Sequence, residues 1–191
     1  MIGDLGIARF GEVLAARGPG PAAGSTAAVT AALAAGLATK VAKGAAEREA
    51  VTRDLAEELD ALRARALRLA DDDVEAFAGF LEARRLDRIS DRGAGPAAAE
   101  AIVQVPADVV AVAVRVAELA ALLADTGPDQ LTGDAVTAAF LAAAAAESAA
   151  ALVGANIADS DITTGDELAD PRVEHVEERA AHARTLAERL V

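Results

Sequence analysis

Two long segments that are rich in alanine and almost free of charge constrain the fold of this 191-residue chain more than any other feature. The first begins near Ser25 and has no charged residue before Lys40. The second runs from Thr132 to about Ile157, with Glu147 near its centre. A helix on a protein surface needs a polar stripe, which these segments nearly lack. They are therefore predicted to be helices buried on all sides, inside the bundle or in a subunit interface, and the excess apolar surface predicts a homodimer.

The composition excludes several classes of protein. A net charge of −13 does not provide the basic face that a nucleic-acid binder needs to displace counterions. Without cysteine, the chain can form neither disulfide bonds nor thiolate metal sites. Residues 140–158 have the length of a membrane span, but alanine is only weakly apolar, and no basic and apolar leader opens the chain. We therefore expect a soluble cytoplasmic protein that binds neither nucleic acid nor membranes.

Apolar residues spaced three and four apart dominate the rest of the chain, and no segment alternates convincingly as a strand does. The sequence predicts one all-α domain over residues 1–191, a bundle of about six to eight helices. Asp71 to Asp73 are expected to interrupt the third helix, residues 84–96 to form a loop, and Pro106 to open a new helix. The expected helices span residues 4–16, 24–44, 46–86, 97–105, 106–124, 132–157 and 173–190.

The first candidate site is the glycine- and proline-rich segment from Pro19 to Ser25, which leads onto the second expected helix with Ser25 as its predicted N-cap. The free N–H groups and partial positive charge of such a helix end suit a carboxylate or phosphate ligand. An ordinary chain breaker followed by a helix cap explains the same residues without any ligand. The spacing alone leaves both interpretations open.

The second candidate site is Asp71 to Asp73, because aspartate is a poor residue for a helix interior. Asp73 shares a helix face with Phe77 and Phe80, so its carboxylate would lie at the edge of an apolar stripe and be partly desolvated. Such a carboxylate could act as a general base or bind a ligand amine. The alternative is a helix junction at which all three acids are solvated.

Other polar residues occupy positions that invite a role. Asp134 follows Thr-Gly at a helix start, which is the position of an N-cap acid. Glu147 and Asn156 lie on the second alanine-rich helix, where a buried polar group needs a partner or a function, unless Glu147 faces out of the bundle. His175 and His182 share a face of the last helix, but the glutamates around them favour a solvated surface over a metal site.

Four motifs follow one another along the chain. They are Gly-Pro-Gly-Pro-Ala-Ala-Gly-Ser ending at Ser25, Asp-Asp-Asp-Val-Glu-Ala-Phe at Asp71–Phe77, Val-Pro ending at Pro106, and Gly-Pro-Asp-Gln-Leu-Thr-Gly-Asp ending at Asp134. In order and spacing they resemble the cyclodeaminase/cyclohydrolase family. This family includes the cyclodeaminase domain of formiminotransferase-cyclodeaminase and the stand-alone methenyltetrahydrofolate cyclohydrolases. The corresponding family patterns are Pro-x-Pro-Gly-Gly-Gly-Ser, Asp-x-Asp-Ala-x-Ala-Phe/Tyr, Val-Pro and Gly-Asn-x-Asn-x-x-Ser-Asp.

The resemblance implies an all-helical homodimer that binds a tetrahydrofolate derivative as its substrate, without a metal, in a cleft at or near the subunit interface. It implies hydrolysis of a methenyl bridge or loss of ammonia from a formimino group. Asp73 and Asp134 would be the catalytic residues by this resemblance. The implied substrate-binding residues are Pro21, Gly24, Ser25, Phe77 and Asn156.

The chain also departs from the family patterns. Ala22 and Ala23 replace two of the three glycines, and Pro128 and Gln130 replace the two asparagines. An anionic, glutamate-tailed folate would further require Lys40, Lys43 and Arg48 to cluster near the cleft. These departures leave a second hypothesis open, in which the chain is a catalytically inactive or diverged helical dimer that binds a small ligand without turnover.

Overall fold

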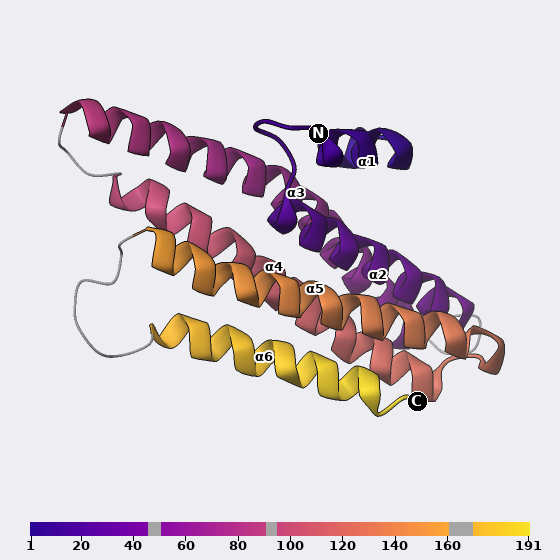
Figure 1. Cartoon of the computed structure of the whole chain (residues 1–191). Coiled ribbons are helices and arrows are strands. Elements are labelled where there is room, and N and C mark those ends of the chain that lie inside the picture. Colours follow the sequence, from indigo (N-terminus) through magenta and orange to yellow (C-terminus); the bar gives the residue numbers. More distant parts are fainter. Residues whose placement is uncertain (46–50, 91–94, 161–169) are drawn as a thin grey trace.

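The computed structural model describes residues 1–45, 51–90, 95–160 and 170–191. Within these ranges the chain is entirely helical apart from short connections, as predicted from the spacing of apolar residues. Figure 1 shows the elements in chain order. They are the short 3-10 helix η1 (Ile2–Asp4), α1 (Ile7–Ala15), α2 (Ala23–Ala45), α3 (Val51–Ser90), α4 (Pro96–Thr126), the 3-10 helix η2 (Asp129–Leu131), α5 (Thr132–Asp159) and α6 (Pro171–Glu188).

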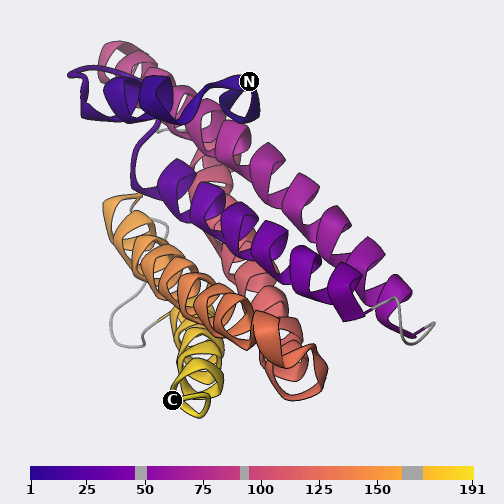
Figure 2. The ribbon, with the colours of Figure 1, turned by 90° about the vertical axis from the view of Figure 1, so that its right-hand side faces the viewer.

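The long helices α2 to α5 lie alongside one another, and α6 packs against α4 and α5 (Figures 1 and 2). The short helix α1 lies on the outside of this bundle; none of its residues is fully buried, although Phe10 packs against the core. Helices α2 and α5 contribute mainly alanine to the core, whereas α4 contributes more valine than any other residue. Small side chains let the helix axes approach closely, which explains how a chain with so few aromatic residues still forms a packed interior.

Helix α3 runs without a break through Asp71, Asp72 and Asp73, so the predicted interruption is wrong. Two of the three acids bond to backbone of other segments: Asp71 Oδ1 accepts from Ile2 N at 2.7 Å, and Asp73 Oδ2 accepts from Ser25 N at 2.8 Å. Hydrogen bonds to a charged group outweigh the small helix propensity penalty of aspartate. Tertiary contacts therefore override the local preference at this point.

The predicted loop at residues 84–96 is wrong over residues 84–90, because α3 continues to Ser90, and α4 already starts at Pro96; residues 91–94 lie outside the described residues. Pro106 does not open a helix but lies fully buried inside α4. A proline has no N–H, so it leaves the carbonyl four residues earlier, that of Ile102, without its helical donor. Asn156 of α5 supplies that donor, since its Nδ2 lies 2.5 Å from Ile102 O.

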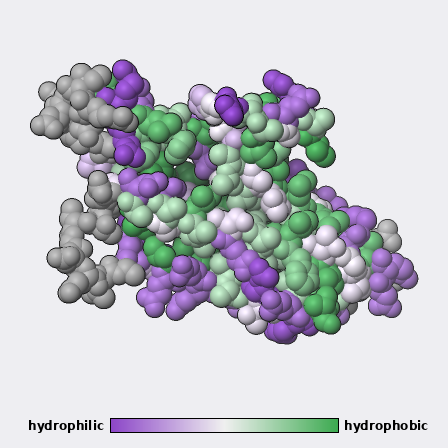
Figure 3. Space-filling view, viewed as in Figure 1, coloured by the Kyte–Doolittle hydropathy of each residue, from purple (hydrophilic) through white to green (hydrophobic). Residues whose placement is uncertain are grey.

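Within one chain, helices α2 and α5 are buried on part of their circumference only, so of the two expected settings the bundle interior accounts for only one side of each helix. Each presents one outer stripe of apolar and weakly polar residues, and Leu33 in the middle of α2 is 58% exposed. Figure 3 shows such residues gathered across the middle of one face, with hydrophilic residues around its edges. The exposed or partly exposed members are Thr26, Val29, Thr30, Leu33 and Leu37 of α2, and Thr137, Phe140, Leu141, Ala144 and Ser148 of α5.

Both alanine-rich helices are long and apolar enough to cross a membrane by length and composition alone. In their most apolar windows, 61% of the α2 residues and 50% of those in the segment containing α5 are buried inside the protein. The core helices of soluble proteins have these same properties. Glu147, the charged residue near the middle of α5, forms an ion pair with Arg184 of α6 at the surface.

Candidate functional site

Asp73 of α3 reaches the first turn of α2, where it contacts Ser25. Its Oδ2 accepts hydrogen bonds from Ser25 N at 2.8 Å and from Ser25 Oγ at 2.7 Å. The first N–H groups of a helix have no partner within the helix, and its N-terminus carries a partial positive charge. Ser25 is the third residue of α2 and is fully buried, so it is not the N-cap that the sequence predicts. Asp73 instead caps α2 from a neighbouring helix.

Gly24 makes this contact sterically possible. A Cβ atom on residue 24 would lie 2.6 Å from Asp73 Cγ and closer still to Oδ1. Real side chains essentially never approach so closely, and therefore any larger residue at position 24 would displace the carboxylate. Oδ2 is held by Ser25, whereas Oδ1 has no hydrogen-bond partner among the described residues. The site thus fixes one carboxylate oxygen and leaves the other available.

Asp73 lines a small hollow of about 110 Å³ between α2, α3 and α5. The hollow brings together four of the predicted site residues: Gly24, Asp73, Phe77 and Asn156. Ser25 joins them through its bonds to Asp73, whereas Pro21 belongs to the loop at its rim and does not line it. The remaining lining residues are Gly20, Ala22, Ala23, Val74 and Leu152.

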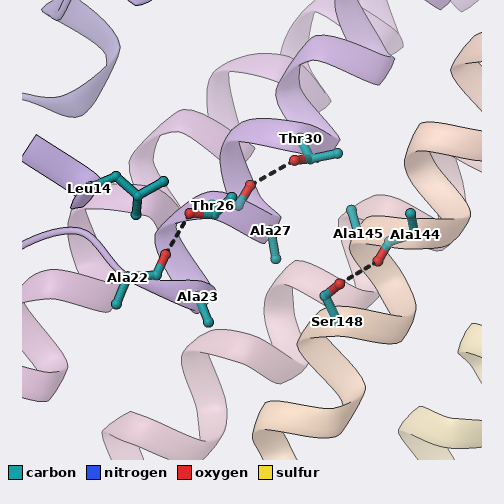
Figure 4. Close-up of a pocket in the computed structure, with 9 residues that line it drawn as sticks. All are labelled: Leu14, Ala22, Ala23, Thr26, Ala27, Thr30, Ala144, Ala145 and Ser148. Carbon is teal, nitrogen blue, oxygen red and sulfur yellow. Dashed lines mark hydrogen bonds between the residues drawn. The ribbon is translucent and has the colours of Figure 1, made fainter. Parts of the chain in front are cut away.

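A larger hollow of about 420 Å³ adjoins the first, and Ala22 and Ala23 line both (Figure 4). Its hydroxyl groups bond back to their own helices: Thr26 donates to Ala22 O, Thr30 to Thr26 O, and Ser148 to Ala144 O. These bonds occupy the hydroxyl protons, so the walls present mainly methyl groups. The larger hollow is therefore an apolar extension of the polar hollow at Asp73.

Asp134 does not belong to this site within one chain. It lies in the first turn of α5 without a capping hydrogen bond, and its Oδ2 is 2.5 Å from Lys40 Nζ. Because Ser25 and Lys40 are 15 residues apart on α2, the two aspartates lie roughly 22 Å apart along that helix. The sequence motifs predict that Asp73 and Asp134 are both catalytic residues. Within one chain, however, the fold places them beside opposite ends of α2.

The basic cluster expected near the cleft is likewise far from Asp73. Lys40 pairs with Asp134, and Lys43 pairs with Asp60 at 2.8 Å, which lowers the pKa of that carboxyl. Arg48, the third expected member, lies outside the described residues. His175 and His182 are exposed, and within the described ranges no group of three metal-ligating side chains is close enough to hold an ion.

Two lining residues escaped the sequence analysis. Val74 is the neighbour of Asp73, and Leu152 lies one helical turn before Asn156 on α5. The four-residue spacing of Leu152 and Asn156 on one helix face is the signal that could have identified Leu152. No comparable sequence signal predicts the contact of Asp73 with Gly24 and Ser25. Asp73 follows Ser25 by 48 residues, so no local spacing relates the two segments.

Comparison with known proteins places this arrangement in a family. The sequence model of the formiminotransferase-cyclodeaminase family matches residues 6–171. The chain belongs to this family. The crystal structure of formiminotetrahydrofolate cyclodeaminase from Thermotoga maritima is similar to it, with a TM-score of 0.86 and 26% sequence identity over 100% of this chain and 96% of that chain. A search of curated proteins finds no match. The resemblance inferred from the motifs is confirmed.

The structure accounts for one departure of this chain from the motifs of the formiminotransferase-cyclodeaminase family. At Gly24, one of the three positions where the family pattern has glycine, a Cβ atom would collide with the carboxylate of Asp73. Ala22 and Ala23 are exposed, and Ala23 already belongs to α2, so neither needs the positive φ that would require glycine. The alanines at positions 22 and 23 therefore do not alter the approach of Asp73 to α2.

Proposed function

We propose that the chain is a folate-dependent one-carbon enzyme, a formiminotetrahydrofolate cyclodeaminase or a methenyltetrahydrofolate cyclohydrolase, that acts on a C–N bond of a tetrahydrofolate derivative. The observation that carries this proposal is the similarity of the whole chain to a protein of that description, at a TM-score of 0.86. The family match over residues 6–171 and the hollow at Asp73 support it.

In this proposal Asp73 acts on the reacting carbon and on the attacking nucleophile, which is water in the cyclohydrolase reaction and a nitrogen of the folate in the cyclodeaminase reaction. The methenyl and formimino groups are amidinium-like, so their carbon carries positive charge that a carboxylate stabilises. A carboxylate can also accept a proton from the attacking nucleophile. Ser25 holds Oδ2 with two hydrogen bonds, which leaves Oδ1 as the atom that faces the substrate. Gly24 permits this geometry, and both residues are therefore positioning residues for Asp73.

The other residues of the hollow would bind the flat heterocycle. Phe77 is 49% exposed and, with Val74 and Leu152, offers an apolar wall against which a ring system can pack. Asn156 offers an amide, and Pro21 fixes the backbone of the loop at the rim. Pockets for ligands of this size measure roughly 300–1,000 Å³, so the remainder of the folate would extend into the larger hollow beside it.

We further propose that the protein is a homodimer in which the partner completes the site. The outer stripe of α2 and α5 is the surface that a second copy would cover, with Leu33 at its centre. A twofold axis at Leu33 would pair the α2 helices in antiparallel orientation, because position 33 lies midway between Ser25 and Lys40. The partner subunit's Asp134 and Lys40 would then lie beside Asp73. This arrangement would let both predicted catalytic acids serve one site.

Light scattering tests the dimer. The expected mass is twice the 19.2 kDa of one chain, and Leu33→Arg is expected to reduce it to that of the monomer. Leu122→Arg is the matched control, because Leu122 is a similarly exposed leucine on α4, outside the outer stripe. A monomeric wild-type protein at micromolar concentration, or equal effects of the two substitutions, would contradict the proposed interface.

The activity is tested by mixing the purified wild-type protein with each candidate substrate. Loss of methenyltetrahydrofolate absorbance reports the cyclohydrolase reaction, and release of ammonia from formiminotetrahydrofolate reports the cyclodeaminase reaction. We expect one of the two rates to exceed the uncatalysed rate. We expect that rate to be unchanged after dialysis against a metal chelator, because the proposed reaction needs no metal. We also expect the protein to be found in the cytoplasmic fraction of the cell. Saturable folate binding without either reaction would instead support a binding protein.

A further inference from the structure

A proline in the middle of a helix is strongly disfavoured, yet Pro106 is fully buried in the interior of the 31-residue helix α4. No turn or helix start explains it, because the helix is continuous from Pro96 to Thr126. Its direct consequence is that Ile102 O lacks the N–H that every other interior helix carbonyl receives. The buried carbonyl is instead satisfied by Asn156 Nδ2 at 2.5 Å, across the contact between α4 and α5.

Asn156 links this carbonyl to the hollow that contains Asp73. The same side chain lines the hollow, and it is only partly buried. Because a carbonyl oxygen accepts hydrogen bonds only, Nδ2 must face Ile102, and this fixes which way round the amide is held. Oδ1 of Asn156 bonds to no described residue and is not among the buried polar atoms without a partner. It is therefore accessible as a hydrogen-bond acceptor.

We propose that Pro106 is a positioning residue for the site: by removing one backbone N–H it reserves Ile102 O for Asn156, which holds the Asn156 amide with Oδ1 available to ligand. This inference rests on the proposed function. It also specifies the ligand chemistry, since Asn156 Oδ1 and Asp73 Oδ1 are then two acceptors on one hollow. The site selects a heterocycle that presents N–H donors, one of them on or beside a cationic centre.

Substitution of Pro106 by alanine tests the proposal because it restores the missing N–H. Alanine is the best helix former, so Pro106→Ala is expected to fold with an unchanged or higher melting temperature. Its N–H competes with Asn156 for Ile102 O, and we expect the KM for the folate substrate to rise ~5- to 10-fold, the effect of losing one hydrogen bond. A purely structural role for Pro106 predicts a change in stability and none in KM.

A double-mutant cycle identifies the route of the effect. If Pro106 acts through Asn156, Asn156→Ala and the double variant with Pro106→Ala will have equal KM values. Val105→Ala is the matched control, since Val105 is the partly buried neighbour on the same helix and its substitution changes no backbone hydrogen bond. Additive effects of Pro106→Ala and Asn156→Ala, or an equal effect of Val105→Ala, would overturn the proposal.

The NMR signals of the Asn156 side-chain amide give a readout that does not depend on activity. In the wild-type protein, one Nδ2 proton is expected to be shifted downfield and to exchange slowly, and in Pro106→Ala it is expected to lose both properties. Fast exchange in the wild-type protein would overturn the proposal even if the variant failed to fold. If the amide behaves as expected while the wild-type protein turns over neither folate, the positioning by Pro106 stands and the proposed function fails.

Discussion

The contact between Gly24 and Asp73 leads to a prediction that contradicts ordinary helix propensity. Replacing glycine by alanine inside a helix normally stabilises a protein by about 0.5–1 kcal/mol. Gly24→Ala is expected to do the opposite. Its Cβ would lie 2.6 Å from Asp73 Cγ, so the carboxylate must move away from Ser25.

The magnitude follows from the bonds that would break. Asp73 Oδ2 accepts two hydrogen bonds from Ser25, and a hydrogen bond to a charged group contributes about 1.5–3 kcal/mol. Loss of one such bond, offset by the helix preference of alanine, leaves a net destabilisation of about 1–2 kcal/mol. For a chain of this size each kcal/mol corresponds to about 2–4 °C in Tm.

Chemical denaturation of purified variants measures this effect. The matched control is Gly36→Ala on the same helix, where the new Cβ would meet only Arg63 Cδ at an ordinary 3.5 Å. We expect the control to be as stable as the wild-type protein or more stable, and Gly24→Ala to be less stable and less active. If both variants gained stability, Asp73 would not be packed against α2 as described, and the reasoning about the site would be refuted.

Two further predictions concern carboxylates that bond to backbone. Asp71→Ala removes the acceptor of Ile2 N, which holds the N-terminal segment against α3. Because no residue of α1 is fully buried, trypsin is expected to cleave at Arg9 or Arg17 faster than in the wild-type protein, while the thermal transition of the bundle persists. Unchanged cleavage would contradict this prediction. Asp170→Ala removes the side-chain cap of α6 and is expected to cost about 1 kcal/mol in urea denaturation. Arg172 lowers the pKa of Asp170, so the stabilisation by this cap is present above the unfolded-state pKa of about 3.9 and is lost as the pH falls below it. If Asp170→Ala remained less stable than the wild-type protein at low pH, this role of Asp170 would be contradicted.

The sequence was sufficient for the helical architecture because that architecture depends on a repeating local pattern. Apolar residues at spacings of three and four place α3 and α6 correctly within a few residues, and the low charge of α2 and α5 marks the helices that form much of the core. Even the valine-rich part of α4 is helical as predicted. Which residues form the outer stripe of α2 and α5 could not be predicted, because small and apolar residues face both the core and the outside.

The site could be predicted only in part. Asp73, Phe77 and Asn156 were identified from their positions on helices and from family motifs, and the fold brings all three to one hollow. The expected breaks at Asp71 to Asp73 and at Pro106 were wrong for a common reason: the local penalty is compensated by hydrogen bonds to segments distant in sequence. Such compensation depends on the fold and leaves no local signal.

The central claim is that Asp73 performs chemistry in addition to capping α2, and paired measurements of turnover and stability on Asp73→Asn test it most directly. The asparagine Oδ1 can still accept from Ser25 N and Oγ, but both bonds lose their charge assistance, so the free energy of unfolding is expected to fall by about 2–3 kcal/mol while the protein stays folded in the assay. The kcat/KM for the folate substrate is expected to fall by ~100-fold or more, the usual contribution of a general base. Asp72→Asn, on the exposed side of the same helix, is expected to change neither quantity. An Asp73→Asn variant that retains wild-type kcat/KM would contradict the account.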